Sequence, residues 1–220
     1  MMTVCPLCTS RQTLDYHRDA RRDYLQCQRC ELVFVPPAQR LSRDAERAVY
    51  DCHVNSPDDT GYRRFLSRLF DPLHQRLAPG ACGLDFGAGP GPTLSVMFEE
   101  AGHPMAIYDP FYAPATLALE QCYDFITASE VVEHLFEPGR ELERLAGMLN
   151  PDGWLALMTK RVTSKEAFAR WHYIRDPTHV SFFSEATFVW LAQHLHLSLT
   201  LPAADVALLH KPAPRSTQTD

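Results

Sequence analysis

Short apolar runs alternate with segments of helical periodicity over the last two thirds of the chain. The apolar runs have the length of buried strands, and they lie at residues 82–86, 105–108, 123–128 and 154–159. The segments between them have the apolar spacing or the end signals of helices, and they lie at residues 93–101, 137–149 and 185–196. Strands that alternate with helices indicate an α/β fold with a parallel sheet.

An amphipathic helix precedes this region. Apolar residues recur on one face of residues 62–77, and the opposite face carries arginines. Pro72 lies inside the helix and predicts a kink or a break. We expect residues 44–80 to form a helical connector that closes as a lid over the α/β body at residues 81–220.

Four of the seven cysteines lie in the first 30 residues, as Cys5 with Cys8 and Cys27 with Cys30. The two Cys-x-x-Cys pairs are separated by 18 residues, which is typical of a zinc site with four thiolates and no open position. About 40 residues without a core of their own need a metal or a disulfide, and the cytosol disfavours disulfides. We predict one structural zinc ion in a zinc ribbon over residues 1–43. Disulfides or four buried thiols are the alternative.

The remaining cysteines, Cys52, Cys82 and Cys122, lie outside this pattern, and we expect them to be small buried hydrophobic side chains. No apolar run approaches the roughly 18 residues that a membrane span needs. The first residues also lack the apolar stretch of a signal peptide. We therefore expect a cytoplasmic protein that does not contact a membrane.

A glycine-rich turn follows the first predicted strand of the body. Gly87, Gly89 and Gly91 come just after Asp85, and Asp109 lies 22 residues beyond Gly87, at the end of the next strand. In such a unit a nucleotide lies across the strand ends, and the second acid binds the ribose hydroxyls. A dinucleotide site prefers Gly-x-Gly-x-x-Gly, so the spacing here argues against a nicotinamide-dependent dehydrogenase.

This segment resembles the first motif of class I methyltransferases that use S-adenosylmethionine. The resemblance extends to residues 123–135, which are similar to the fourth strand and following turn of that superfamily, and to the turn at 150–153. It covers about residues 81–211 and is close to the branch of small methyltransferases with an N-terminal zinc ribbon. It implies a Rossmann-like sheet that ends in an antiparallel hairpin at residues 197–201 and 206–210.

The resemblance also implies roles for single residues. The three glycines would form the cofactor turn, Asp85 would bind the methionine ammonium, and Asp109 would bind the ribose. Ser129 and Glu130, just past the fourth strand, would line the pocket near the cofactor.

The chain departs from the superfamily after Asp109. Only 13 residues separate Asp109 from Tyr123, which is too short for a strand, a crossover helix and another strand. We expect the third strand and its helix to be missing or reduced to a loop. Phe111 or Tyr112 would then flank the adenine.

Aromatic and histidine side chains follow the fifth strand, at the sheet edge where the cofactor lies. Methyl transfer is an in-line displacement that needs a positioned nucleophile and, for many acceptors, a base. We name His134, His172 and His179 as candidate bases because imidazole titrates near neutral pH. Trp171 and Tyr173 are candidate substrate-binding rings.

Two other interpretations of this segment stay open. Several of its side chains can cap helices or fill the core, as we expect for Phe182 and Phe183. A second metal site of His172, Asp176 and His179 is disfavoured, since no helix brings the three onto one face.

The charge is unevenly distributed. The net charge is −6 overall, +2 for residues 1–80 and −8 for the rest. An acidic body suits a cationic cofactor and argues against bulk electrostatic binding of nucleic acid. We expect methyl transfer to an O, N or C atom of a small molecule. An RNA base methyltransferase that binds RNA through the ribbon is the first alternative, and a non-catalytic protein that presents the ribbon to a partner is the second.

Overall fold

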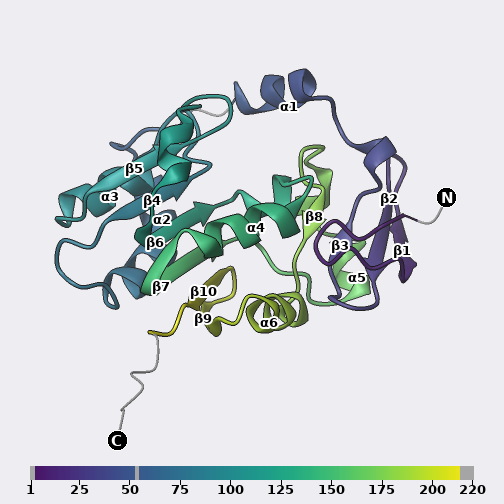
Figure 1. Cartoon of the computed structure of the whole chain (residues 1–220). Helices are drawn as coiled ribbons and strands as arrows, with labels where there is room; N and C mark the ends of the chain where they lie inside the picture. Colours follow the sequence, from purple (N-terminus) through teal and green to yellow (C-terminus); the bar gives the residue numbers. More distant parts are fainter. Residues whose placement is uncertain (1–2, 53–54, 214–220) are drawn as a thin grey trace, which may run out of the picture.

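The computed structural model describes residues 3–52 and 55–213. Residues 1–2 and 214–220, the outer ends of the predicted ribbon and body, lie outside the described residues, as do residues 53–54 of the predicted connector. Figure 1 shows a cysteine-containing head beside an α/β body, with one helix, α1 (Arg43–Tyr50), running between them.

Six strands form the central sheet in the order β5-β4-β6-β7-β10-β9. Their bounds are β4 (Gly83–Phe86), β5 (Met105–Tyr108), β6 (Tyr123–Ser129), β7 (Leu149–Met158), β9 (Ser198–Ala203) and β10 (Val206–His210). The first four strands in this order are parallel to one another. β10 pairs antiparallel with β7, and β9 pairs antiparallel with β10. The predicted α/β class and terminal hairpin are confirmed.

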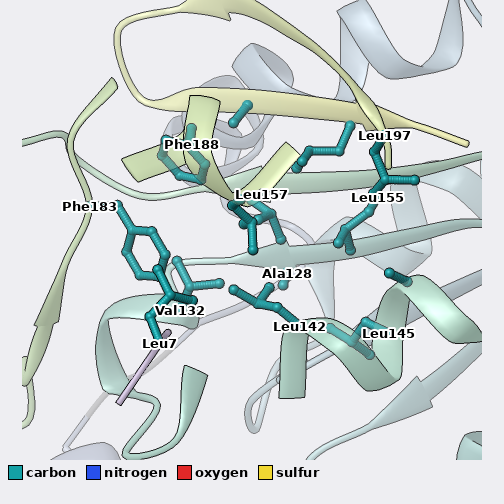
Figure 2. Packing of buried hydrophobic residues seen from close by; sticks show 14 of the residues in the cluster. Leu7, Ala128, Val132, Leu142, Leu145, Leu155, Leu157, Phe183, Phe188 and Leu197 are labelled. Carbon is teal, nitrogen blue, oxygen red and sulfur yellow. The ribbon is translucent and has the colours of Figure 1, made fainter. Parts of the chain in front are cut away.

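Helices cover both faces of this sheet. The helices are α2 (Thr60–His74) and α3 (Thr93–Glu100) on one face, and α4 (Pro138–Gly147) and α6 (Glu185–His194) on the other. Side chains along β7 alternate between the layers: Leu155 and Leu157 join the α4 and α6 side, whereas Ala156 and Met158 join the α2 and α3 side. Figure 2 shows the layer between the sheet and the helices α4 and α6.

The predicted lid helix is mostly a core element. α2 continues through Pro72 and buries Leu66, Leu69 and Leu73 against α3 and the sheet. The proline lies in the last turn of the helix, and it removes only the hydrogen bond that its N–H would donate to the Arg68 carbonyl. Most of the connector helix therefore stabilises the sheet, and α1 is the part that stands clear of the core.

The shortened segment after β5 has no strand in the sheet. A single bridge between Asp109 and Ala113 and the 3-10 helix η2 (Thr116–Glu120) occupy the space between β5 and β6. Thus β5 is an edge strand, as the chain length between Asp109 and Tyr123 requires.

The head contains β1 (Thr13–Arg18), β2 (Asp23–Cys27) and β3 (Val33–Phe34), followed by the 3-10 helix η1 (Pro37–Gln39). A strand from the body, β8 (Ser181–Phe182), completes its sheet by pairing with β3. The remaining elements are η3 (Val132–His134), α5 (Lys165–Phe168) and η4 (His172–Arg175).

The head and the body share one hydrophobic core. Leu7 and the four head cysteines belong to the same buried cluster as Leu142, Leu155 and Phe188 of the body. Figure 2 shows Leu7 of the head among the buried side chains of the body. At the start of α4, Gly139 lies so close to the backbone of Leu7 that a Cβ would clash with it.

The expectation for the three other cysteines is wrong. Cys52, Cys82 and Cys122 are exposed. Each lies in a short connection just after a helix or just before a strand, and such connections run over the surface. Among the helices of the described residues, none combines the length and the apolar composition needed to cross a membrane.

Candidate active site

A cavity of about 840 Å³ opens at the carboxyl ends of β4, β5 and β6. The segments that follow these three strands line it, together with residues of α1, of the first two turns of α2 and of α3 and α4. The lining residues from α1, the connector and α2 include Arg43, Glu46, Tyr50, Asn55, Tyr62 and Phe65.

The glycine turn after β4 forms one wall of the cavity. Gly87 and Gly89 have φ angles of 75° and 64°, in the left-handed region that glycine tolerates best. A Cβ at Gly87 would clash with Val131, and a Cβ at Gly91 would clash with the carbonyl of Asn55. The turn therefore needs glycine both for its conformation and for the close approach of neighbouring segments.

Asp85 lies at the base of this turn and is 4% exposed. The Thr127 hydroxyl donates a hydrogen bond of 2.8 Å to its Oδ1 atom. Burial nevertheless raises the pKa of Asp85 to about 7, because desolvation of the carboxylate outweighs the hydrogen bonds that Thr127 and the Ser95 backbone donate.

Asp109, at the end of β5, connects the two adjacent turns. Its Oδ2 atom accepts the Gly89 amide at 3.0 Å, and its Oδ1 atom accepts the amides of Phe111 and Tyr112 at 2.8 and 3.0 Å. These bonds hold the glycine turn against the segment that carries two aromatic rings, both of which line the cavity.

Two histidines lie next to each other in the lining of the cavity. The rings of His134 and His179 are 4.7 Å apart between centroids, and both line the cavity with Ser129 and Glu130. His179 Nδ1 is 2.8 Å from the Tyr173 carbonyl, which can only accept, so Nδ1 carries the proton and Nε2 carries the lone pair. Burial lowers the pKa of His179, which favours the neutral ring.

Two carboxylates lie beside these histidines. Glu133 is fully buried and accepts the Tyr173 hydroxyl on Oε1, and Glu130 accepts the same hydroxyl at 3.4 Å. Burial raises the pKa of Glu133 to about 8 and that of Glu130 to about 7. Glu130 also has a φ of 53°, an uncommon conformation for a residue with a side chain.

Three predicted acceptor-side residues do not line the cavity. His172 is exposed, with its Nε2 atom 3.0 Å from Lys160 Nζ. Trp171 stacks on Tyr173 with centroids 4.8 Å apart, and Tyr173 is buried beneath the cavity floor. None of these three side chains lines the cavity, so they do not reach the reacting atoms from their positions in this structure.

The sequence analysis did not identify α1 or Glu133 as parts of the candidate site. Arg43, Glu46 and Tyr50 line the cavity, yet α1 buries no residue, so burial of apolar side chains does not mark the face that it turns to the cavity. The spacing of four residues between Glu46 and Tyr50 could have indicated that both side chains lie on one face of a helix. In the structure the Tyr50 hydroxyl donates to Glu46 at 2.8 Å.

The head cysteines converge on one point away from the cavity. Their four Sγ atoms lie within 4.8 Å of one another, with Cys5 and Cys30 3.5 Å apart and Cys8 and Cys27 3.4 Å apart. These separations exceed the bond length of about 2.05 Å in a disulfide. Tetrahedral zinc with Zn–S bonds of about 2.3 Å needs sulfur separations of about 3.8 Å, so the four donors suit that ion.

Arg22 of the head connects it to the segment that carries His179. Its guanidinium is buried and donates to the carbonyls of Ile174, Asp176, Pro177 and His179 at 2.7 to 3.0 Å. The head therefore fixes the backbone that leads to His179 and the carbonyl of His179 itself.

Comparisons with known proteins agree with this geometry. The sequence model of a family described as a methyltransferase domain matches residues 59–200. No curated protein matches the chain.

Several solved structures share the fold. The chain is similar to 1,6-didemethyltoxoflavin-N1-methyltransferase of Burkholderia thailandensis, with a TM-score of 0.50 and 17% identity over 90% of this chain and 99% of that one. It is also similar to an O-methyltransferase family protein from the same organism, with a TM-score of 0.53 and 13% identity over 78% and 64% of the two chains.

A third similar structure is the complex of a Haloferax volcanii methyltransferase with the Trm112 activator. Its TM-score is 0.51, at 11% identity over 78% of this chain and 100% of that one. The family match covers more than half of the residues, and the matched range contains the glycine turn, both cavity acids and both histidines. The chain belongs to the methyltransferase-domain family, and it is an S-adenosylmethionine-dependent methyltransferase.

Proposed function

We propose that the protein transfers the methyl group of S-adenosylmethionine to an O, N or C atom of a small molecule. The observation that carries this proposal is one cavity whose lining contains both the glycine turn with its acids and the histidine pair. A volume of about 840 Å³ is within the usual range for sites that enclose a cofactor or a small ligand.

The cofactor would occupy the glycine end. Asp85 would bind the methionine ammonium, and Asp109 would accept the ribose hydroxyls in addition to its backbone amides. Phe111 and Tyr112 would flank the adenine in place of contacts from the missing third strand. Ser129 and Glu130 would lie beside the sulfonium.

The acceptor would occupy the histidine end. Methyl transfer requires the nucleophile, the methyl carbon and the sulfur to lie in line, so the acceptor must enter opposite the sulfonium. His134 and His179, which line the cavity, would flank that space. The lone pair on His179 Nε2 can accept a proton or bind a metal ion, which are the two usual roles of a neutral imidazole.

The cysteine cluster would hold one structural zinc ion. All four thiols are buried and none lines the cavity, so no open position faces an acceptor. We keep the proposed division into a ribbon at 1–43, a connector at 44–80 and a methyltransferase domain at 81–220.

A small acceptor is favoured over RNA because the head has no dense tract of Lys and Arg, and some of its arginines are bound within the protein. Its seven arginines include Arg22, which is buried on backbone carbonyls, Arg18, which pairs with Asp23, and Arg40, which donates to Val35 and Phe136. A surface that grips phosphates needs exposed cations in a cluster.

Incubation with methyl-labelled cofactor and cell extract tests the acceptor class. We expect label in the small-molecule fraction. Label confined to the RNA fraction would contradict the proposal and favour the RNA alternative. The absence of cofactor binding by calorimetry would favour the non-catalytic alternative.

The ribose role is tested by Asp109→Ala with Asp152→Ala as an exposed control. We expect the affinity for S-adenosylmethionine to fall at least tenfold for the first variant and to stay unchanged for the second, because two ribose contacts contribute about 1.4 kcal/mol or more. Unchanged affinity for Asp109→Ala would refute the role.

A further inference from the structure

Three side chains that commonly bind metal ions meet beneath the acceptor end of the cavity. Glu133, His134 and His179 each offer one ligand atom, and these atoms all lie within 4.8 Å of one another. They come from the 3-10 helix after β6 and from the segment before β8, so the fold brings two separate elements to one point.

The environment of Glu133 indicates a missing positive partner. The residue is fully buried, and its Oε1 atom accepts the Tyr173 hydroxyl. No residue in the described ranges 3–52 and 55–213 donates a hydrogen bond to its buried Oε2 atom. A buried carboxylate oxygen without a donor is costly, and a bound cation would remove that cost.

The ring of His179 has the tautomer and the fixed orientation of a metal ligand. Its Nδ1–H donates to the Tyr173 carbonyl, which fixes the ring orientation and leaves the Nε2 lone pair available. Arg22 donates to the carbonyls of Asp176 and of His179 itself, so the ring sits on a fixed backbone. Tyr173 thus supports two of the three ligands, one through its hydroxyl and one through its carbonyl.

A second carboxylate lies next to this group. Glu130 shares the Tyr173 hydroxyl with Glu133, and in the described part of the chain its buried Oε1 atom also has no hydrogen-bond donor. Two adjacent carboxylates repel each other, so their pairing favours a divalent cation between them.

We propose that Glu133, His134 and His179 hold a divalent transition-metal ion, with Glu130 as a fourth ligand. Two imidazoles and a carboxylate suit Zn²⁺, Mn²⁺ or Fe²⁺ better than Mg²⁺ or Ca²⁺, which prefer oxygen ligands. His134, His179 and Glu130 line the cavity, so a remaining coordination position faces the acceptor.

The ion would determine the chemical class of the acceptor, an inference that rests on the proposed methyl transfer. A hydroxyl oxygen of the acceptor would bind the open position and lose its proton to solvent, because a bound cation lowers the pKa of its ligand. The oxygen lone pair would then attack the methyl carbon. A C–O bond forms, the C–S bond breaks, and its electron pair stays on sulfur. The acceptor class is therefore a hydroxyl compound.

Electron paramagnetic resonance of added Mn²⁺ tests the site in the full chain with zinc already bound by the head. Mn²⁺ is chosen because the soft thiolates of the head disfavour it. We expect one Mn²⁺ per chain, and at least a tenfold loss of affinity in Glu133→Gln and in His179→Ala. His172→Ala is the matched control from the same segment, and it should bind Mn²⁺ like the wild type.

Two results would overturn the proposal. One is that the wild type binds no Mn²⁺ and takes up no Zn²⁺ beyond one per chain. The other is that Glu133→Gln and His179→Ala both retain wild-type Mn²⁺ affinity, which would put the ion elsewhere. Circular dichroism identifies a variant that fails to fold, and the other variant then decides. Calorimetry with S-adenosylmethionine on the same wild-type sample separates failure of the metal site from failure of the proposed function.

Discussion

At the scale of single residues, the two acids of the cavity are held in different ways. Asp109 accepts three backbone amides at 2.8 to 3.0 Å, whereas Asp85 is buried with its hydroxyl partner Thr127. Amides donate to a carboxylate without needing a countercharge. Asp85 instead bears most of its desolvation cost, and a cation placed beside it would relieve that cost.

We therefore predict that the affinity for S-adenosylmethionine rises with pH. The pKa of Asp85 in the folded protein is raised from 3.8 to about 7, so below pH 7 the carboxyl is protonated and must lose its proton to pair with the ammonium. The affinity should increase between pH 5.5 and 7, by at most about tenfold per unit, and level off above it. Calorimetry at several pH values measures this.

Asp85→Asn is the control for that series, because it keeps the shape and removes the titration. Its affinity should be weaker and almost independent of pH over the same range. Equal slopes for Asp85→Asn and the wild type would show that another group titrates. The raised pKa also predicts that Asp85 destabilises the fold as the pH rises from about 4 to 7, since the folded state holds the proton more tightly.

At the scale of elements, the contact between the head and η4 is the least expected feature. The carbonyls of an irregular segment lack the backbone N–H donors that a β-ladder or a helix would supply. Here a buried arginine donates to four of these carbonyls instead. The same segment continues into β8, which pairs with β3 of the head. The head thus orders the backbone that carries His179.

Arg22→Ala should lower the free energy of unfolding by about 2–4 kcal/mol, because it removes charge-assisted hydrogen bonds and leaves several carbonyls without a donor. Arg21→Ala is the matched control, since Arg21 is exposed and makes one bond of 3.4 Å to the Arg175 carbonyl. Its effect should stay within about 0.5 kcal/mol. Urea unfolding measures both, and equal effects would contradict the proposed link.

At the scale of the whole molecule, the head and the body are continuous. The cysteine cluster lies in the same hydrophobic core as the sheet and α4, and the head sheet is completed by the body. Loss of order in the head would therefore reach the cavity, although the cysteines do not line it. This distinguishes the head from a ribbon attached by a flexible linker.

Cys8→Ser should remove one zinc per chain, lower the melting temperature by about 5 °C or more and reduce methyl transfer, because structural zinc contributes folding free energy. Metal analysis, thermal unfolding and the labelled-cofactor assay measure the three effects. Cys82→Ser changes an exposed cysteine and should match the wild type. Wild-type activity in a zinc-free Cys8→Ser variant would show that the head acts independently.

The sequence by itself determined the α/β class, the glycine turn and the cysteine cluster. Each depends on short-range spacing: glycines that permit a left-handed turn, an acid at the end of the next parallel strand, and paired thiols. The missing third strand also followed from chain length alone.

Only the tertiary structure decided which polar residues reach the cavity. It brought Glu133 to His179 and Arg22 to the segment around it, turned Trp171 and His172 away, and left three cysteines exposed. Periodicity reports whether a residue lies on the buried side of its own element. Contacts between residues far apart in the chain depend on how elements pack, and a sequence pattern does not encode that packing locally.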